Sequence, residues 1–237
     1  ANPSKGFSIV SYTRVGGTGT VGHGLGATPK FIITKTRSIV NAWNNYHASV
    51  GAGYRIFFSN SVPVASSTAW NNTSPTSTVF SVGDANTNGS GTEMIAYCFS
   101  EVAGYSKFGS YTGTGTTTGN VTTVGFRPAF LMVKGTSLTS EWVILDNTRD
   151  PNPDPAKNVL MPNNTNADTT AATGLYVKFT DTGFQPVGAG TDTNSSGATY
   201  IYLAFADTRN AVFNFDASGN KNNWLPNNIN SNAESES

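Results

Sequence analysis

Few of the residue types that carry enzyme chemistry occur in this chain. His23 and His47 are its only histidines, Cys98 is its only cysteine, and no Gly-x-Ser-x-Gly sequence is present. A zinc site of histidines and cysteines needs more ligands than these. A Ser-His-Asp triad would rest on a single histidine with no local motif beside it. We therefore expect no catalytic residues, no metal site and no cofactor.

An acidic loop is the one place where carboxylates gather. Asp146, Asp150 and Asp154 lie in the sequence DNTRDPNPDP, with Arg149 among them. Three carboxylates are suited to a hard cation, and two are suited to acid–base catalysis. The prolines indicate an exposed loop, and the arginine offers a local partner. The sequence favours a solvated loop with an Arg–Asp pair.

Two short glycine and asparagine motifs resemble ligand loops only in part. Gly17, Gly19 and Gly22 have dinucleotide-loop spacing, but a strand is predicted after them where a helix is needed. The sequences DANTNG and TDTNSSG begin like EF-hand loops, yet Ile95 and Leu203 stand where a bidentate glutamate is required. Turns explain both motifs, with weak calcium binding outside the EF-hand geometry left open.

The elements that would hold these residues come from an internal duplication. Six residues recur at a constant spacing of 99 positions, from 12 to 111 through 43 to 142. Later pairs are spaced by 104 positions (80 to 184) and 106 positions (95 to 201), so the spacing grows only across loops. The six constant pairs are Tyr12/Tyr111, Gly26/Gly125, Pro29/Pro128, Phe31/Phe130, Lys35/Lys134 and Trp43/Trp142.

Each half holds short runs rich in Val, Ile, Phe, Tyr and Thr, separated by segments rich in Gly, Asn and Pro. Such patterns predict antiparallel strands joined by turns. We expect an all-β fold of two tandem sandwich or jelly-roll units, residues 1–103 and 104–207, or their fusion into one lectin-like sandwich. The recurring Trp43 and Trp142 are predicted to lie in the core.

Residues 208–237 differ from both halves because they are rich in Asn and end in AESES. Their sparse apolar residues are too few for a core of their own. We expect an extended arm or linker that docks on a sandwich of the same chain or of a neighbour. Its anchors would be Phe213, Phe215, Trp224 and Leu225.

Charge and hydropathy exclude several partner classes. Only 12% of residues are charged, and 14 basic residues balance 14 acidic ones. A neutral chain has no field that attracts nucleic acid or anionic membranes. No apolar run approaches the roughly 18 residues of a membrane span, so we expect no membrane insertion. The start ANPSKGF lacks a signal-peptide pattern, and we expect any export signal to lie outside these residues.

Six aromatic and polar residues are candidates for binding sugar. Trp70 has no counterpart in the second half and stands beside Asn71 and Asn72, a pairing of aromatic face and amides that suits a pyranose. His47 in the first half corresponds to Asp146 in the second, and this divergence is typical of an exposed site. We therefore predict a glycan site from Trp70, Asn71, Asn72, His47, Asp146 and Arg149, with loop packing as the alternative role for Trp70.

Segments from about Gly6 to Asp207 resemble a repeated β-domain of bacteriophage tail-fibre and virion structural proteins, including those of marine phages and cyanophages. They include GFSIVSYT, VGHGLGATPKFIITK, IAYCFSEVAGYSKFGSYTG and TYIYLAFAD. The resemblance implies an extracellular place on the virion surface and a display or adhesion role. It implies no catalytic residues, because the family has no assigned chemistry.

The function we expect is a non-enzymatic tail-fibre or adhesin module that displays loops for host-surface polysaccharide. The alternative is a structural subunit, either a capsid-decoration protein or a self-assembling extracellular filament, whose partners are other virion proteins or copies of itself. In either role we expect a homo-oligomer. An envelope-degrading enzyme would need a carboxylate pair or triad that the sequence does not offer.

Overall fold

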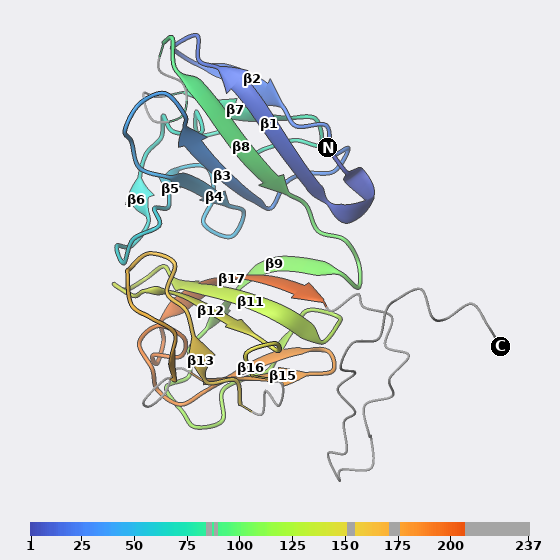
Figure 1. The fold of residues 1–237 in the computed structure, drawn as a ribbon, viewed down its shortest axis with the longest axis vertical. Helices are drawn as coiled ribbons and strands as arrows, with labels where there is room; N and C mark the ends of the chain where they lie inside the picture. Colours follow the sequence, from blue (N-terminus) through green and yellow to red (C-terminus); the bar gives the residue numbers. More distant parts are fainter. Residues whose placement is uncertain (84–86, 88–89, 151–154, 171–175, 207–237) are drawn as a thin grey trace, which may run out of the picture. The chain divides into compact units, whose positions relative to one another are not determined.

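The computed structural model describes residues 1–83, 87, 90–150, 155–170 and 176–206 (Figure 1). Apart from a 3₁₀ helix at Pro3–Lys5, the elements named in these residues are all β-strands, and every strand pair is antiparallel. The predicted all-β class is therefore confirmed. Ala1–Asp207 form one compact unit.

The first half contains one four-stranded sheet with two short strand pairs. The sheet has the order β1-β8-β3-β4, formed by β1 (Phe7–Thr13), β8 (Glu93–Phe99), β3 (Phe31–Thr36) and β4 (Asn44–His47). The second layer is the pair β2 (Gly19–Gly22) and β7 (Val79–Val82). The other pair is β5 (Tyr54–Arg55) and β6 (Val64–Ala65).

The second half repeats this plan. Its four-stranded sheet has the order β9-β17-β11-β12, formed by β9 (Ser106–Thr112), β17 (Thr199–Ala206), β11 (Pro128–Gly135) and β12 (Trp142–Asp146). A three-stranded sheet joins β10 (Thr122–Thr123), β16 (Gly183–Val187) and β15 (Tyr176–Thr180), and β13 (Asn158–Val159) pairs with β14 (Thr169–Thr170).

The strand registers of the two large sheets correspond through the spacings found in the sequence. Phe31 lies opposite His47 and Phe99, and Phe130 lies opposite Asp146 and Phe205. A shift of one residue in register would turn every side chain to the other face of the sheet. Because the registers agree, equivalent residues of the two halves point to equivalent faces of their sheets. This agreement is consistent with the duplication.

Hydrogen bonds of the repeated residues also recur. The Tyr12 hydroxyl donates to the carbonyl oxygen of Thr87 at 3.0 Å, and the Tyr111 hydroxyl donates to that of Thr193 at 2.6 Å. Lys35 Nζ donates to the carbonyl of Asn41, and Lys134 Nζ donates to that of Ser140. The repeated tyrosine and lysine therefore hold equivalent loops, which is a structural reason for their recurrence.

Three apolar clusters hold the strands together. One lies within each half, between its four-stranded sheet and its second layer; Phe80 belongs to the first and Phe184 to the second. The third cluster takes residues from both halves, including Phe31, Ile56, Phe108 and Trp142. Burial of this shared apolar surface contributes stability that neither half has alone.

The prediction that both recurring tryptophans lie in the core is wrong for Trp43. Trp142 is fully buried, but Trp43 is 38% exposed. Trp142 lies inside β12 and donates from Nε1 to the carbonyl of Phe57 at 2.9 Å, whereas Trp43 precedes β4. Trp43 makes a T-shaped contact with Phe58 (6.1 Å between ring centroids) and lies beneath the Lys35 ammonium (5.8 Å from Nζ to the ring centroid).

The other short motifs are parts of strands and turns. Gly19 and Gly22 are the ends of β2, so no helix follows the glycine run. Cys98 is buried in β8, as a small apolar residue would be. The anchors of the predicted arm, Phe213, Phe215, Trp224 and Leu225, lie outside the described residues, as do Asp84, Asn86 and Asp154.

Candidate functional site

Trp70 is not a sugar-stacking residue. Its side chain is only 1% exposed, and it packs edge-on against Tyr46 (5.8 Å) and Phe80 (6.5 Å) inside the core of the first half. An aromatic ring must present a face to solvent to stack on a pyranose. The burial of Trp70 corrects the predicted site and supports the alternative role, loop packing.

Asn71 and Asn72 remain at the surface beside this buried ring. Both are exposed, and both have positive φ angles of 48° and 45°. Asparagine is one of the few residues that adopts this left-handed conformation at low cost. The presence of two asparagines here is therefore explained by the turn that follows Trp70, and without the tryptophan they do not form an aromatic sugar site.

His47 is also buried, which corrects the prediction of an exposed position. Its side chain lies between the halves, where Nε2 is 3.3 Å from the carbonyl oxygen of Tyr202 and Nδ1 accepts from the Ser49 amide at 3.1 Å. These partners assign the neutral tautomer with its proton on Nε2. Burial lowers the pKa of His47 to about 4.

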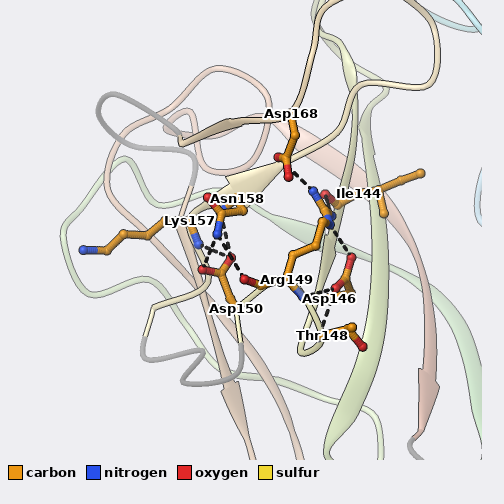
Figure 2. Close-up of polar contacts among 8 residues, drawn as sticks. All are labelled: Ile144, Asp146, Thr148, Arg149, Asp150, Lys157, Asn158 and Asp168. Atoms are coloured by element: carbon orange, nitrogen blue, oxygen red, sulfur yellow. Dashed lines mark hydrogen bonds and ion pairs between the residues drawn. The ribbon is translucent and has the colours of Figure 1, made fainter.

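The predicted Arg–Asp pair in the acidic loop is present, as Figure 2 shows. Arg149 Nε donates to Asp146 Oδ2 at 2.7 Å, and its two terminal nitrogens donate to Asp168 Oδ1 and to the carbonyl of Ile144, each at 3.1 Å. The Arg149 amide also donates to Asp146 Oδ1 at 2.8 Å. The hydrogen bonds of the guanidinium therefore hold the loop in place.

The carboxylates of this loop are engaged in the same way. Burial alone would raise the pKa of Asp146, but the hydrogen bonds and the charge of Arg149 hold it below its usual value. Asp150 accepts from the amides of Lys157 (2.9 Å) and Asn158 (2.7 Å), and from the Asn158 side chain (2.9 Å) (Figure 2). Both acids cap backbone amides, so the loop is built as a structural clamp.

A groove elsewhere in the second half offers a better place for a ligand. It has a volume of about 830 Å³ and is open to solvent. One wall comes from β15, through Tyr176 and Lys178, and the other is the segment Val187–Asp192. Alternation along β15 directs Lys178 away from the core that Val177 and Phe179 enter, while the half-buried Tyr176 at the start of the strand packs against that core. Its full lining is Thr117, Pro155, Tyr176, Lys178, Val187, Gly188, Ala189, Gly190, Thr191 and Asp192.

Asn194 holds the Val187–Asp192 wall of this groove in one conformation. Its side chain is buried, donates to the carbonyl of Gly188 at 2.6 Å and accepts from the Thr114 amide at 2.9 Å. The Tyr200 hydroxyl donates to the carbonyl of Thr191 at 2.6 Å. Because all of these partners belong to the chain itself, the protein holds the wall in one conformation, which lowers the cost of ordering it on binding.

The groove carries charges of both signs. Lys157 extends over the Tyr176 ring, with Nζ 5.7 Å from its centroid. Asp192 accepts from the Glu141 amide at 2.7 Å, and burial raises the pKa of this carboxyl. A groove of this kind presents one aromatic surface, ammonium donors and a carboxylate acceptor to a neutral polar ligand.

Within the described part of the chain, no group of three His, Cys, Asp or Glu side chains is arranged to hold a metal ion. Nor is any described helix long and apolar enough to cross a membrane.

Comparison with known proteins gives a family without a described activity. A family model named "Domain of unknown function (DUF7483)" matches residues 1–209, which is most of the 237 residues. The chain belongs to the DUF7483 family. Neither a curated protein nor a solved structure matches the chain significantly. The DUF7483 match includes both halves and every residue that lines the groove.

Sequence reasoning missed the groove of this DUF7483 domain, although part of its signal is visible. In YVKFTDTGF, Tyr176 and Lys178 alternate with Val177 and Phe179, so Lys178 is predictably on the outer side of a strand. Nothing local shows that the GAGTD segment lies opposite them. That proximity depends on the pairing of β15 with β16 and on the path of the chain after Val187.

Proposed function

We propose that this protein is a non-enzymatic, extracellular surface module of the tail-fibre or adhesin type, which binds a host-surface glycan in the groove of its second half. The observation that carries the proposal is the groove itself, with Tyr176 and Lys178 on one side and the Val187–Asp192 segment on the other. The resemblance to phage tail-fibre repeats supports the virion location.

The chemistry of the lining favours a sugar over other ligand classes. A pyranose has an apolar face for an aromatic ring and a rim of hydroxyls that both donate and accept. Tyr176 supplies the ring, Lys178 supplies donors and Asp192 supplies an acceptor. A hydrophobic ligand would displace water from these charged groups without replacing its hydrogen bonds, which costs free energy. The open shape suits a segment of a longer polysaccharide.

A glycan array with polysaccharides of bacterial envelopes tests the proposal. We expect binding to a defined subset, weakened at least about tenfold by Tyr176→Ala, since aromatic anchors carry much of the energy of a small interface. Tyr54→Ala is the matched control, because Tyr54 is 44% exposed and lies in the first half. Absence of binding to any glycan, or equal loss in both variants, would contradict the proposal.

The alternative, a structural self-assembling subunit, is favoured by a separate observation. The large sheet of the first half has a partly exposed apolar face whose equivalent in the second half is buried.

A further inference from the structure

Each four-stranded sheet has an outer face, which points away from the core of its own half. In the second half this face carries Phe108, Ile201, Leu203, Met132, Lys134 and Trp142. By strand alternation and the matching registers, the equivalent face of the first half carries Ile9, Ile95, Tyr97, Ile33 and Lys35. Trp43, one residue before β4, lies with its ring beneath the Lys35 ammonium. The two faces therefore correspond residue by residue.

The first half covers the outer face of the second half. The edge of the Phe58 ring meets Trp142 at 5.2 Å between centroids, and Trp142 Nε1 donates to the carbonyl of Phe57 at 2.9 Å. Lys134 Nζ donates to the carbonyl of Asn60 at 3.3 Å, and the Ser140 amide donates to the same oxygen at 3.0 Å. The covering segment is thus Ile56–Asn60, together with the Phe31 and Phe99 rings.

The same face of the first half meets the second half at the end that holds Phe31 and Phe99, with Ile33 packed against the same cluster, and it is more exposed elsewhere. Ile9 is 53% exposed where its counterpart Phe108 is 5% exposed, and Trp43 is 38% exposed where Trp142 is fully buried. Ile33, Ile95 and Tyr97 are half-buried, although their counterparts in the second half are buried. A contiguous apolar sheet face of this kind marks an interaction surface.

The covering segment is duplicated as well. Ile56 exchanges two backbone hydrogen bonds with Asn45, at 2.8 and 3.0 Å, and Leu160 does so with Ile144, at 2.8 and 3.2 Å. Asn45 and Ile144 are equivalent, so Leu160–Asn164 in the second half corresponds to Ile56–Asn60 in the first. Ile56 is fully buried against the other half, whereas Leu160 is 36% exposed.

We propose that a second copy of this chain docks its Leu160–Asn164 segment on the outer face of the first half, repeating between chains the contact that joins the halves within one chain. In this arrangement Trp43 Nε1 donates to the carbonyl of Met161 of the other copy, and Lys35 donates to that of Asn164. The contact is head to tail, so its repetition builds a ring or an open filament. It uses apolar packing and backbone acceptors, which suits a chain with no net charge.

Sedimentation velocity of the full chain tests this association. We expect the average mass to rise with concentration between about 1 and 100 µM, the range of a modest interface. Trp43→Glu and Ile9→Glu, both at partly exposed positions, should each weaken association at least about 30-fold. Leu160→Glu should do the same from the other side of the contact. Val15→Glu and Val121→Glu, which are 80% and 49% exposed elsewhere, are the matched controls.

A mixing experiment separates this contact from other modes of self-association. Trp43→Glu keeps an intact Leu160 segment, and Leu160→Glu keeps an intact outer face. Each variant alone should be monomeric, while their equimolar mixture should form a heterodimer that grows no further.

The outcomes that would overturn the proposal are equally concrete. The first is a wild-type protein that stays monomeric over the whole concentration range. The others are self-association that persists in all three variants, and self-association that is lost in the two controls as well. If Trp43→Glu and Ile9→Glu weaken self-association but Leu160→Glu does not, two outer faces pair with each other, and the head-to-tail contact is refuted. Thermal melting of each variant confirms that the monomer is folded.

Discussion

At the scale of single residues, the two histidines share one hydrogen-bonding pattern. His47 Nδ1 accepts from the Ser49 amide, and His23 Nδ1 accepts from the Leu25 amide at 3.2 Å, two residues on in each case. Both Nε2 atoms face a carbonyl oxygen, that of Tyr202 or Thr76. A second proton on the ring would replace the accepted hydrogen bond with a repulsion. These histidines are therefore built to stay neutral.

This pattern predicts that stability falls with acid. The pKa of His47 is about 4 in the folded chain and 6.5 in the reference state, so the unfolded chain binds the additional proton between these values. The stability that neutral His47 contributes to the fold is fully present above about pH 6.5. It is lost as the pH falls through about 4, and the total loss in the free energy of unfolding is about 3 kcal/mol. Urea unfolding at about pH 7.5 and about pH 4.5 measures it.

His47→Gln should flatten this part of the pH dependence, while His23→Gln should retain it. Parallel losses in the wild type and in His47→Gln would show that other groups cause the acid sensitivity.

At the scale of elements, the position of a residue relative to a strand end decides what its side chain does. Trp43 and Trp142 are equivalent in sequence, and Trp142 lies opposite Lys134 in the sheet, while Trp43 lies beneath the Lys35 ammonium just outside its strand. Trp142 is the first residue of β12, whereas β4 begins one residue after Trp43. Both rings contact Phe58, Trp142 at 5.2 Å and Trp43 at 6.1 Å between centroids, but Trp142 also donates from Nε1 to the carbonyl of Phe57. Equivalent residues therefore differ in burial because their neighbours differ.

The two tryptophans should consequently differ in their contribution to stability. Trp142→Ala removes a fully buried ring and the hydrogen bond to Phe57, so we expect a loss of about 3–5 kcal/mol in the free energy of unfolding. Trp43→Ala removes edge contacts and a cation–π pair, for which about 1 kcal/mol is expected. Denaturant unfolding of both variants makes the comparison, and equal losses would contradict the assigned burial.

At the scale of the whole described unit, the halves are joined by the third apolar cluster. Phe99 contacts aromatic rings of both halves. Its ring packs against Phe31 of the first half and against Phe108 and Phe205 of the second, with centroid distances of 6.0 to 6.3 Å. Shared burial of this kind couples the folding of the two halves. Neither half can unfold without exposing apolar surface of the other.

Calorimetry should therefore show one unfolding transition for residues 1–207, with equal calorimetric and van't Hoff enthalpies. Phe99→Ala should lower the free energy of unfolding by about 3 kcal/mol. In the wild type, the fluorescence of tyrosines and tryptophans in both halves should change together during unfolding. Two resolved transitions in the wild type would mean that the third cluster does not couple the halves.

The sequence by itself determined the all-β class and the correspondence of residues between the halves. Both follow from local physics, because strand alternation and turn residues depend on neighbours along the chain. The spacing of 99 positions from Tyr12 to Tyr111 reappears as equal registers and equal hydrogen bonds. The Arg149–Asp146 pair was also predictable, since its partners are three residues apart.

Only the tertiary structure decided which polar and aromatic residues reach solvent. Trp70 and His47 have the composition of a surface site, yet contacts with residues far along the chain bury them, Tyr202 lying 155 positions from His47. The groove beside Tyr176 likewise arises from the path of the chain after β16. Burial is a sum over non-local contacts, and no pattern within a short window contains it.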